Sequence, residues 1–525
     1  MYFKRIISVI LSATLVFMCL TGCEKSEETF SLYIEVDEKV NTLDPQLCSG
    51  TAEEMLVKNL FEGLVRFDKD GNIVPGAAES IETSDDGLNY TFKIRKNAVW
   101  SDGTKVTADD FVFAFERALD PKTKAPKAAL LYSIKNAKEV NMGQTAKPGV
   151  FAEDENTLKI ELAEKNTEFL KNLTSSVAMP CNRAAFKRFK GKYGMNDEDF
   201  ISNGSFYLNN WQNDGELSLK IIADKNYKGS FTANPSSVIF SLGDKKERTE
   251  KLNKNSVDLG FVNYTTSNDK IEVKNFSKTC YVLGINKNSD YGKSEFKKAI
   301  TASINVDDIN EKLEYGLESA DNILPGVILK NNKSLNKLIK TESKTVYNKE
   351  TAKQNYLKGV KEYGIPENAS IIYTGDEKVK SAVLSLAESL QKTLGIVVNI
   401  ENIKSESELK SRIFDGDYTL SVTPLSAQSN SPTQFLSQFE SENSYNIYKF
   451  SNNRYDNIIS GLKDSLSESE FVTATQNMLN IVAESLLITP LFYEIESFGY
   501  SNIYSMPEIS AFDGVIDLAM VKKLK

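Results

Sequence analysis

The most constraining feature of this sequence is a regular alternation of strand and helix patterns between residues 369 and 423. A β-branched run, "ASIIYT", is followed by apolar residues at helical spacing from Val379 to Leu394, with Gly395 suited to the helix end. Residues 396–400 alternate as a strand, "SESELKSRIF" has a helical pattern, and residues 417–423 form another strand pattern. This β-α-β-α-β order predicts a parallel sheet covered by helices, and ligands of such sheets bind beyond the carboxyl ends of the strands.

Length and charge limit the classes of protein to which the chain can belong. Its 525 residues exceed what one hydrophobic core usually supports, which predicts several domains. The formal net charge of −9 argues against a nucleic-acid-binding protein. The chain has no histidine, which removes Ser-His and Cys-His catalysis and the commonest ligand of transition metals, nickel included. The sequence also lacks a paired-acid or phosphate-loop motif, so we predict a protein that is not an enzyme and uses no metal or cofactor.

The amino terminus has the pattern of an export signal. A charged start, "MYFKR", precedes an apolar run at residues 6–20 that is short for a stable membrane-spanning helix. An uncleaved membrane anchor is the alternative interpretation. The next residues, "LTGC", resemble a bacterial lipobox, in which Cys23 receives the lipid and becomes the first residue of the mature protein. We therefore predict a signal peptide at residues 1–22 and lipidation of Cys23.

Three further cysteines, Cys48, Cys181 and Cys280, lie far apart in the sequence. They have no metal-ligand spacing, and we expect buried thiols, with one disulfide as the alternative.

Two conspicuous groups in the first half of the chain have structural interpretations. In "TADDFVFAFERAL", Thr107 and Asp110 have capping-box spacing, which predicts a helix that begins after Thr107 rather than a catalytic pair of aspartates. Trp100 and Trp211 are expected to pack inside the protein rather than stack on a ligand.

Longer blocks of the sequence resemble one family. The blocks are "TLDPQLCSGTAEEMLVKNLFEGLVRFDKDGNIVPGAAES", "YTFKIRKNAVWSDGTKVTADDFVFAFERALDP", "NGSFYLNNW", "FKKAITASINVDDI" and "NIYKFSNNRYDNII". In this order they resemble the oligopeptide- and dipeptide-binding proteins of bacterial ABC importers, the extracellular solute-binding proteins of family 5, cluster C. The resemblance runs from about residue 30 to the C-terminus.

The resemblance implies an α/β, two-lobed fold of the periplasmic-binding-protein type (type II) with an extra α/β domain in the first lobe. The expected ranges are residues 23–61, 184–278 and 488–525 for lobe I, 62–183 for the extra domain and 279–487 for lobe II.

The resemblance also implies a function. Such proteins capture a peptide between the lobes, close by hinge bending and deliver the peptide to a membrane permease coupled to a cytoplasmic ATPase. We therefore expect a monomeric substrate-binding protein, lipid-anchored on the extracellular face of the cell membrane of a Gram-positive-type bacterium.

Ligand-binding residues are implied in both lobes. On lobe I they are Cys48, Ser49 and Gly50. On lobe II they lie in the uncharged stretch "TPLSAQSNSPTQFL" and are Leu425, Ser426, Ala427, Gln428, Ser429 and Asn430. Gln428 stands where the family usually has an aspartate that binds the ligand's α-amine, and a glutamine accepts a hydrogen bond without supplying the opposite charge.

The residue at position 428 leaves three interpretations open. In the first, the ligand is a peptide whose amine is held by Gln428 and a carboxylate elsewhere, such as Asp417 or Glu442. In the second, the ligand lacks a free amine, as a modified or cyclic peptide, a sugar or an opine does. In the third, the alignment is displaced by one or two residues, or the protein senses a ligand without importing it.

Overall fold

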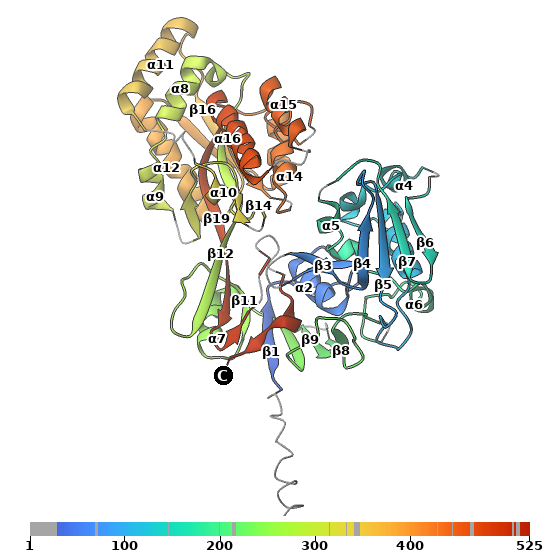
Figure 1. Cartoon of the computed structure of the whole chain (residues 1–525). Coiled ribbons are helices and arrows are strands. Elements are labelled where there is room, and N and C mark those ends of the chain that lie inside the picture. The colour runs from blue at the N-terminus through green and yellow to red at the C-terminus, as the bar shows by residue number, and fades with distance from the viewer. Residues whose placement is uncertain are drawn as a thin grey trace, which may run out of the picture.

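The computed structural model has two lobes joined by a long pair of strands, with a further domain beside one lobe (Figure 1). Within the part of the chain that the structure describes, no helix is long and apolar enough to cross a membrane. The predicted signal peptide and Cys23 lie outside the described residues. The structure describes residues 29–68, 72–144, 146–166, 168–198, 200–212, 217–313, 316–331, 333–340, 347–427, 429–443, 445–462, 467–506, 509–510 and 515–524.

One mixed sheet, with 11 strands among the described residues, runs through both lobes in the order β17-β16-β18-β12-β19-β11-β1-β10-β9-β8, with β13 also paired to β19. The strands of lobe I are β1 (Ser31–Val36), β8 (Phe206–Gln212), β9 (Ser218–Ala223), β10 (Ser237–Leu242) and β11 (Leu259–Val262). The strands of lobe II are β13 (Leu317–Ser319), β16 (Ala369–Tyr373), β17 (Val398–Asn402) and β18 (Leu420–Ser426). Two long strands, β12 (Ile271–Ile285) and β19 (Ile488–Ser501), belong to both lobes.

The sheet narrows where it passes from one lobe to the other. On the lobe I side, β11 pairs with β19 as far as Ser497. On the lobe II side, pairing with β18 and β13 begins at Thr279 and Glu494. Between these points only β12 and β19 continue among the described strands, with a bulge at Lys278 in β12. We call this segment, residues 276–278 and 495–496, the neck.

The predicted β-α-β-α-β pattern is confirmed in lobe II. Strand β16 is parallel to both β17 and β18, and the helices α12 (Glu377–Leu394) and α13 (Glu406–Asp415) follow β16 and β17. Gly395 ends α12 in a left-handed conformation, with φ of 73°. The other described elements of lobe II are α8 (Ser294–Ala302), α9 (Val306–Lys312), α10 (Leu335–Leu338), α11 (Lys349–Tyr363), α14 (Pro432–Ser437), α15 (Asn453–Gly461), α16 (Glu468–Ser485), β14 (Leu329–Lys330) and β15 (Lys333–Ser334).

The last strand of this pattern differs from the prediction of residues 417–423. Strand β18 covers Leu420–Ser426, so it continues through Pro424 into the stretch expected to be a loop. A proline fits inside this strand because β16 pairs with β18 only as far as Val422. Beyond that point no described strand lies along this edge of β18 and needs an N–H donor.

The extra domain has a sheet of its own, in the order β4-β5-β7-β6. Helix α3 (Ala108–Leu119) begins after Thr107 with the predicted capping box, in which the Thr107 N–H donates to Asp110 Oδ2 at 2.9 Å. Trp100 is fully buried, and its indole N–H donates to the same oxygen at 3.3 Å. The described elements of this domain are β2 (Val65–Phe67), β3 (Ile73–Pro75), β4 (Ala78–Thr83), β5 (Asn89–Ile94), β6 (Val150–Asp154), β7 (Thr157–Glu161), α4 (Ala137–Asn141) and α5 (Phe169–Asn172), and α6 (Arg183–Arg188) lies at its expected boundary with lobe I.

The "NGSFY" block is joined by hydrogen bonds to the backbone at the end of α2 (Thr51–Leu60) of lobe I. The Asn203 amide accepts from the Glu62 N–H at 3.0 Å and donates to the Glu62 carbonyl at 2.9 Å. The Gly204 N–H donates to the Leu60 carbonyl at 2.8 Å. A Cβ on Gly204 would lie 2.8 Å from the Leu60 carbonyl atoms, so only glycine fits. The other described elements of lobe I are α7 (Lys245–Asn253), β20 (Tyr504–Ser505) and β21 (Lys522–Lys523).

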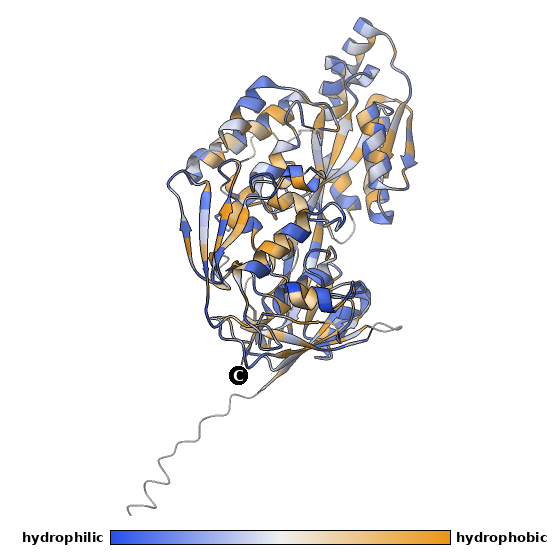
Figure 2. Ribbon diagram, turned by 90° about the vertical axis from the view of Figure 1, so that its right-hand side faces the viewer, coloured by the Kyte–Doolittle hydropathy of each residue, from blue (hydrophilic) through white to orange (hydrophobic). Residues whose placement is uncertain are grey.

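Apolar side chains form separate cores in the two lobes, and the hydropathy colouring shows apolar strands inside and polar helix faces outside (Figure 2). Lobe I and the extra domain share one core. Lobe II has two large cores of its own. Phe276, in the neck, is partly buried and packs against the lobe I core and one lobe II core. Each lobe is therefore packed as a body of its own.

Candidate functional site

The lobe II segment expected to bind ligand begins at the end of β18, beside the neck. Leu425 and Ala427 are buried in a lobe II core. Ser426 is half-buried, and its hydroxyl lies 2.9 Å from the hydroxyl of Thr279. The Ala427 N–H donates to the carbonyl of Lys278 at 3.0 Å. The segment is thus fixed against the neck, and Ser426 is half-buried between the buried residues Leu425 and Ala427.

The uncharged loop that follows has a structural explanation. The Ser429 hydroxyl donates to Gln434 Oε1 and accepts from the Ser431 N–H at 3.1 Å. The Ser431 side chain caps the start of α14 by accepting from the Gln434 N–H. The carbonyl of Asn430 accepts a hydrogen bond from the Leu329 N–H, at the start of β14, at 3.0 Å. Neutral polar groups satisfy these backbone positions, so the lack of charge is not by itself a sign of a ligand.

The lobe I segment forms the start of α2. Cys48 is buried, and its thiol donates to Glu54 Oε1 at 3.0 Å. Burial, assisted by the Glu54 carboxylate, raises the pKa of this thiol and keeps it protonated. The N–H groups of Ser49 and Gly50 donate to Glu53 Oε2 at 3.0 and 3.3 Å. Of the three predicted residues, Ser49 alone is exposed, so its hydroxyl is the group open to a ligand.

The acids proposed as partners of Gln428 have different outcomes. Gln428 itself lies outside the described residues. Asp417 is wrong as a candidate, because it accepts from Arg412 Nε at 2.9 Å at the opposite end of β18. The strand residues Leu420–Pro424, about 17 Å at the usual rise, separate it from the ligand segment. Glu442 is exposed in the turn after α14 and stays a prediction.

Strand pairing places a further acid, Glu494, in the same row of side chains as Ser426 of the lobe II segment. Ser426 on β18 is opposite Thr279 on β12, and Thr279 is opposite Glu494 on β19. Directly opposed residues lie on the same face of a sheet, with strands about 4.8 Å apart, so Glu494 lies roughly 10 Å from Ser426. No local pattern in the sequence indicates this residue, because its position depends on pairing between distant segments.

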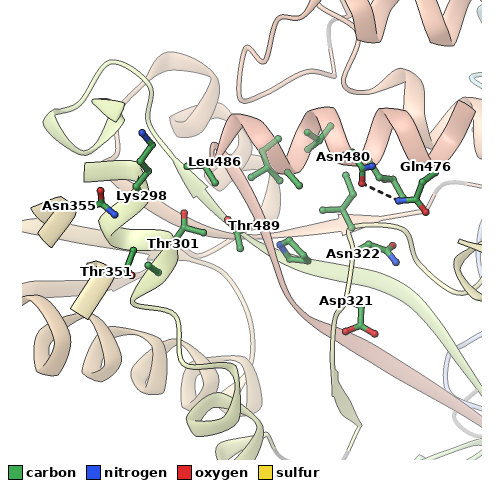
Figure 3. A pocket seen from close by; sticks show the side chains of 17 residues that line it. Lys298, Thr301, Asp321, Asn322, Thr351, Asn355, Gln476, Asn480, Leu486 and Thr489 are labelled. Carbon is green, nitrogen blue, oxygen red and sulfur yellow. Dashed lines mark hydrogen bonds between the residues drawn. The ribbon is translucent and has the colours of Figure 1, made fainter. Parts of the chain in front are cut away.

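A cavity of about 410 Å³ in lobe II is a different feature. It lies inside lobe II among α8, α11, α16 and the start of β19 (Figure 3). Lys298 and Asp321 are among its lining residues, and the Gln476 amide donates to Asn480 Oδ1 at 3.1 Å on one wall. The cavity contains none of the predicted ligand residues. A cavity within one lobe is not enclosed by the approach of the other, so it is not the interlobe site.

The family model for bacterial extracellular solute-binding proteins, family 5 Middle, matches residues 72–446. Among curated proteins, the chain is 25% identical over 489 residues to the dipeptide-binding protein DppE of Bacillus subtilis, which covers 88% of this chain and 86% of that protein.

Solved structures show the same fold. The murein tripeptide-binding protein MppA in its unliganded open form has a TM-score of 0.77 and 22% identity, covering 95% of this chain and 98% of the other. The peptide-bound OppA of Listeria monocytogenes has a TM-score of 0.68 and 21% identity, covering 95% and 100%. The higher score therefore belongs to a form in which the lobes are open.

Proposed function

The chain belongs to the bacterial extracellular solute-binding proteins of family 5, and from this premise we propose that it captures peptides between its lobes for uptake by an ABC importer. Proteins of this family bind solutes and are not enzymes. The observation that carries the proposal is the family match over residues 72–446, which includes every strand of lobe II except β19. The relatives are named for dipeptide and oligopeptide binding, and a relative of the same fold holds a peptide.

Capture works by closure of the lobes about the neck. The two lobes have separate cores, so a rotation between them leaves the packing of each intact. A ligand favours the closed form because only then does it touch both lobes. The likeness to an open, unliganded relative supports an open resting state. In this proposal, residues 279–487 form lobe II and move together.

Recognition uses groups that tolerate many side chains. Main-chain hydrogen bonds to an extended peptide supply affinity that does not depend on the peptide sequence. The hydroxyl of Ser49 on lobe I and the hydroxyls of Ser426 and Thr279 on lobe II are placed to contribute, and water fills the remaining space.

The protein is anchored on the outer face of the cell membrane by a lipid on Cys23, after removal of residues 1–22. The hydrophilic residues 24–29, "EKSEET", then tether the folded part, which begins near β1. A monomer in this position presents its closed form to a permease coupled to a cytoplasmic ATPase.

The bound ligand is the first thing to measure. The protein is released from its lipid, purified and examined by native mass spectrometry for co-purified molecules. A ladder of peptide masses is expected, and a single non-peptide mass would contradict the peptide part of the proposal.

Anchoring and import have separate tests. Replacing Cys23→Ala is expected to abolish lipid labelling and release the protein into the medium. A strain without the protein is expected to grow poorly on peptides as the sole source of amino acids. Undiminished uptake would instead favour a ligand-sensing protein without import.

A further inference from the structure

One row of side chains crosses the sheet at the lobe II edge of the neck. Its members, from β18 through β12 to β19, are Ser426, Thr279 and Glu494. The hydrogen bond of 2.9 Å between the hydroxyls of Ser426 and Thr279 shows that these two point to the same face. Glu494 is directly opposite Thr279, so its carboxylate extends the same row.

Other features place this face at the ligand side of lobe II. Asp376 follows β16, and Ser426 ends β18, so both lie at the carboxyl edge of parallel strands, where ligands of α/β sheets bind. The carboxylates of Glu494 and Asp376 both contribute, after burial, to the raised pKa of Tyr281 on the same face. Glu494 is therefore part of the edge that faces lobe I rather than of a remote surface.

The carboxylate of Glu494 is available. Its side chain is exposed, and among the described residues none donates a hydrogen bond to it or forms an ion pair with it. Enough protein nevertheless surrounds it that desolvation raises the pKa of Glu494, with smaller contributions from Glu496 and Asp376. An acid that is open to solvent and still partly desolvated gains more from a cationic partner than a fully solvated acid does.

We propose that Glu494 is the carboxylate that binds the free α-amine of the peptide ligand. Its charge then supplies what a glutamine at position 428 does not, about two strand spacings away from Ser426. An ammonium group at Glu494 lies beside the hydroxyls of Thr279 and Ser426, which accept from its remaining N–H groups or from a bridging water. The inference rests on the proposed peptide-binding function and names the residue that selects a peptide's amino end.

The test compares peptides with free and blocked amines. Dissociation constants are measured for alanine peptides of two to six residues, each with a free amine and in N-acetylated form, on the wild type and on Glu494→Gln. The wild type is expected to prefer the free amine by at least about tenfold, the usual scale for a hydrogen bond to a charged group. In Glu494→Gln this preference is expected to fall to near one, while binding of the acetylated peptides is unchanged.

Two variants control for charge and for folding. Glu318→Gln removes an equal charge from the exposed neighbouring strand β13, but Glu318 is opposite Tyr493 and so lies on the other face. It is expected to keep the full preference. Glu494→Asp keeps the charge on a shorter side chain and is expected to retain part of the preference even if Glu494→Gln is poorly folded.

The outcomes separate this inference from the proposed function. Equal binding of free and acetylated peptides by the wild type overturns the role of Glu494 and leaves peptide binding in place. An unchanged preference in Glu494→Gln does the same. Binding of no peptide at all by the wild type overturns both.

Discussion

Thr279 on β12 and Glu494 on β19 are directly opposed in the two strands that join the lobes, immediately after the bulge at Lys278. The bulge adds one residue to β12 and so sets which side chains of the following strand point to each face. Because of this extra residue, Thr279 and Glu494 share the face of Ser426 instead of facing the core that holds Cys280 and Tyr493.

The hydrogen bond that Ser277 makes beside this bulge is expected to stabilise lobe II. The Ser277 hydroxyl accepts from the Gly326 N–H at 2.7 Å. Ser277→Ala leaves that N–H without its partner and is expected to cost about 1–2 kcal/mol, seen as a lower thermal unfolding midpoint. Ser460→Ala, which removes an exposed helix hydroxyl bonded to the carbonyl of Asp456, is the control and is expected to cost little. Equal effects of the two variants would contradict the prediction.

Peptide affinity is expected to fall at acidic pH through Glu494. Desolvation by the surrounding protein raises the pKa of this carboxyl above its ordinary value of 4.5, although the side chain is exposed. A protonated carboxyl has no charge for an amine, so affinity is lost as pH falls through this raised pKa, earlier than for an ordinary glutamate. The titratable groups around it are Glu496, Asp376, Tyr281, Lys378 and Lys245. Dissociation constants between pH 4 and pH 8 test this, and the same slope in Glu494→Gln would contradict it.

The junction between lobe I and the extra domain is expected to depend on Arg117. Its guanidinium donates to Asp44 Oδ2 at 2.6 Å, with both side chains less than 10% exposed, and lies over the ring of Phe186. Arg117→Met leaves a buried carboxylate unpaired and is expected to cost about 3–5 kcal/mol in the free energy of unfolding. Arg183→Met removes the exposed pair with Glu116 and is expected to cost less than about 1 kcal/mol. Chemical denaturation of both variants decides the comparison.

Glycine at position 204 is expected to be irreplaceable. A methyl group there meets the backbone of Leu60 at 2.8 Å, which the chain end of α2 cannot avoid without shifting. Gly204→Ala is therefore expected to lower the unfolding midpoint by several degrees. Gly461→Ala, at the end of α15 where no atom lies within 4 Å, is expected to be neutral or slightly stabilising. A neutral Gly204→Ala would contradict the described contact.

The three thiols of the folded part are expected to be unreactive. Cys48, Cys181 and Cys280 are free and buried, and burial raises the pKa of Cys181 to about 12. A thiol reagent added at neutral pH to protein that begins after Cys23 is expected to label none of them until a denaturant is added. Rapid labelling of the native protein would show that one of them is accessible.

Local patterns in the sequence predict the elements whose signals are local. Gly395 at the end of α12 and the Thr107–Asp110 cap of α3 are both confirmed, and so is the parallel order of the lobe II strands. The start of α2 also has a local signal in "SGTAEE", in which Glu53 accepts from the N–H groups of Ser49 and Gly50.

Features that depend on pairing between strands far apart in the chain could not be predicted from local sequence patterns. The end of β18 at Ser426 depends on where β16 stops, which decides whether Pro424 is tolerated. The position of Glu494 depends on a bulge in another strand. Asp417 and Glu442 are close to the loop in sequence. Asp417 is nevertheless distant in space, because it precedes β18 and the loop follows the other end of that strand.

The neck has a mechanical consequence. A ribbon of two strands twists more readily than a wide sheet, while its hydrogen bonds keep its length fixed. A small torsion there is multiplied along each lobe, so the outer walls travel furthest and residues at the pivot travel least. In the closure proposed above, Glu494 lies beside the pivot and is expected to move little. Under the proposed role of Glu494, the amino end of a peptide would be bound at the axis before closure, and the rest of the peptide would be enclosed as the outer walls of the lobes approach.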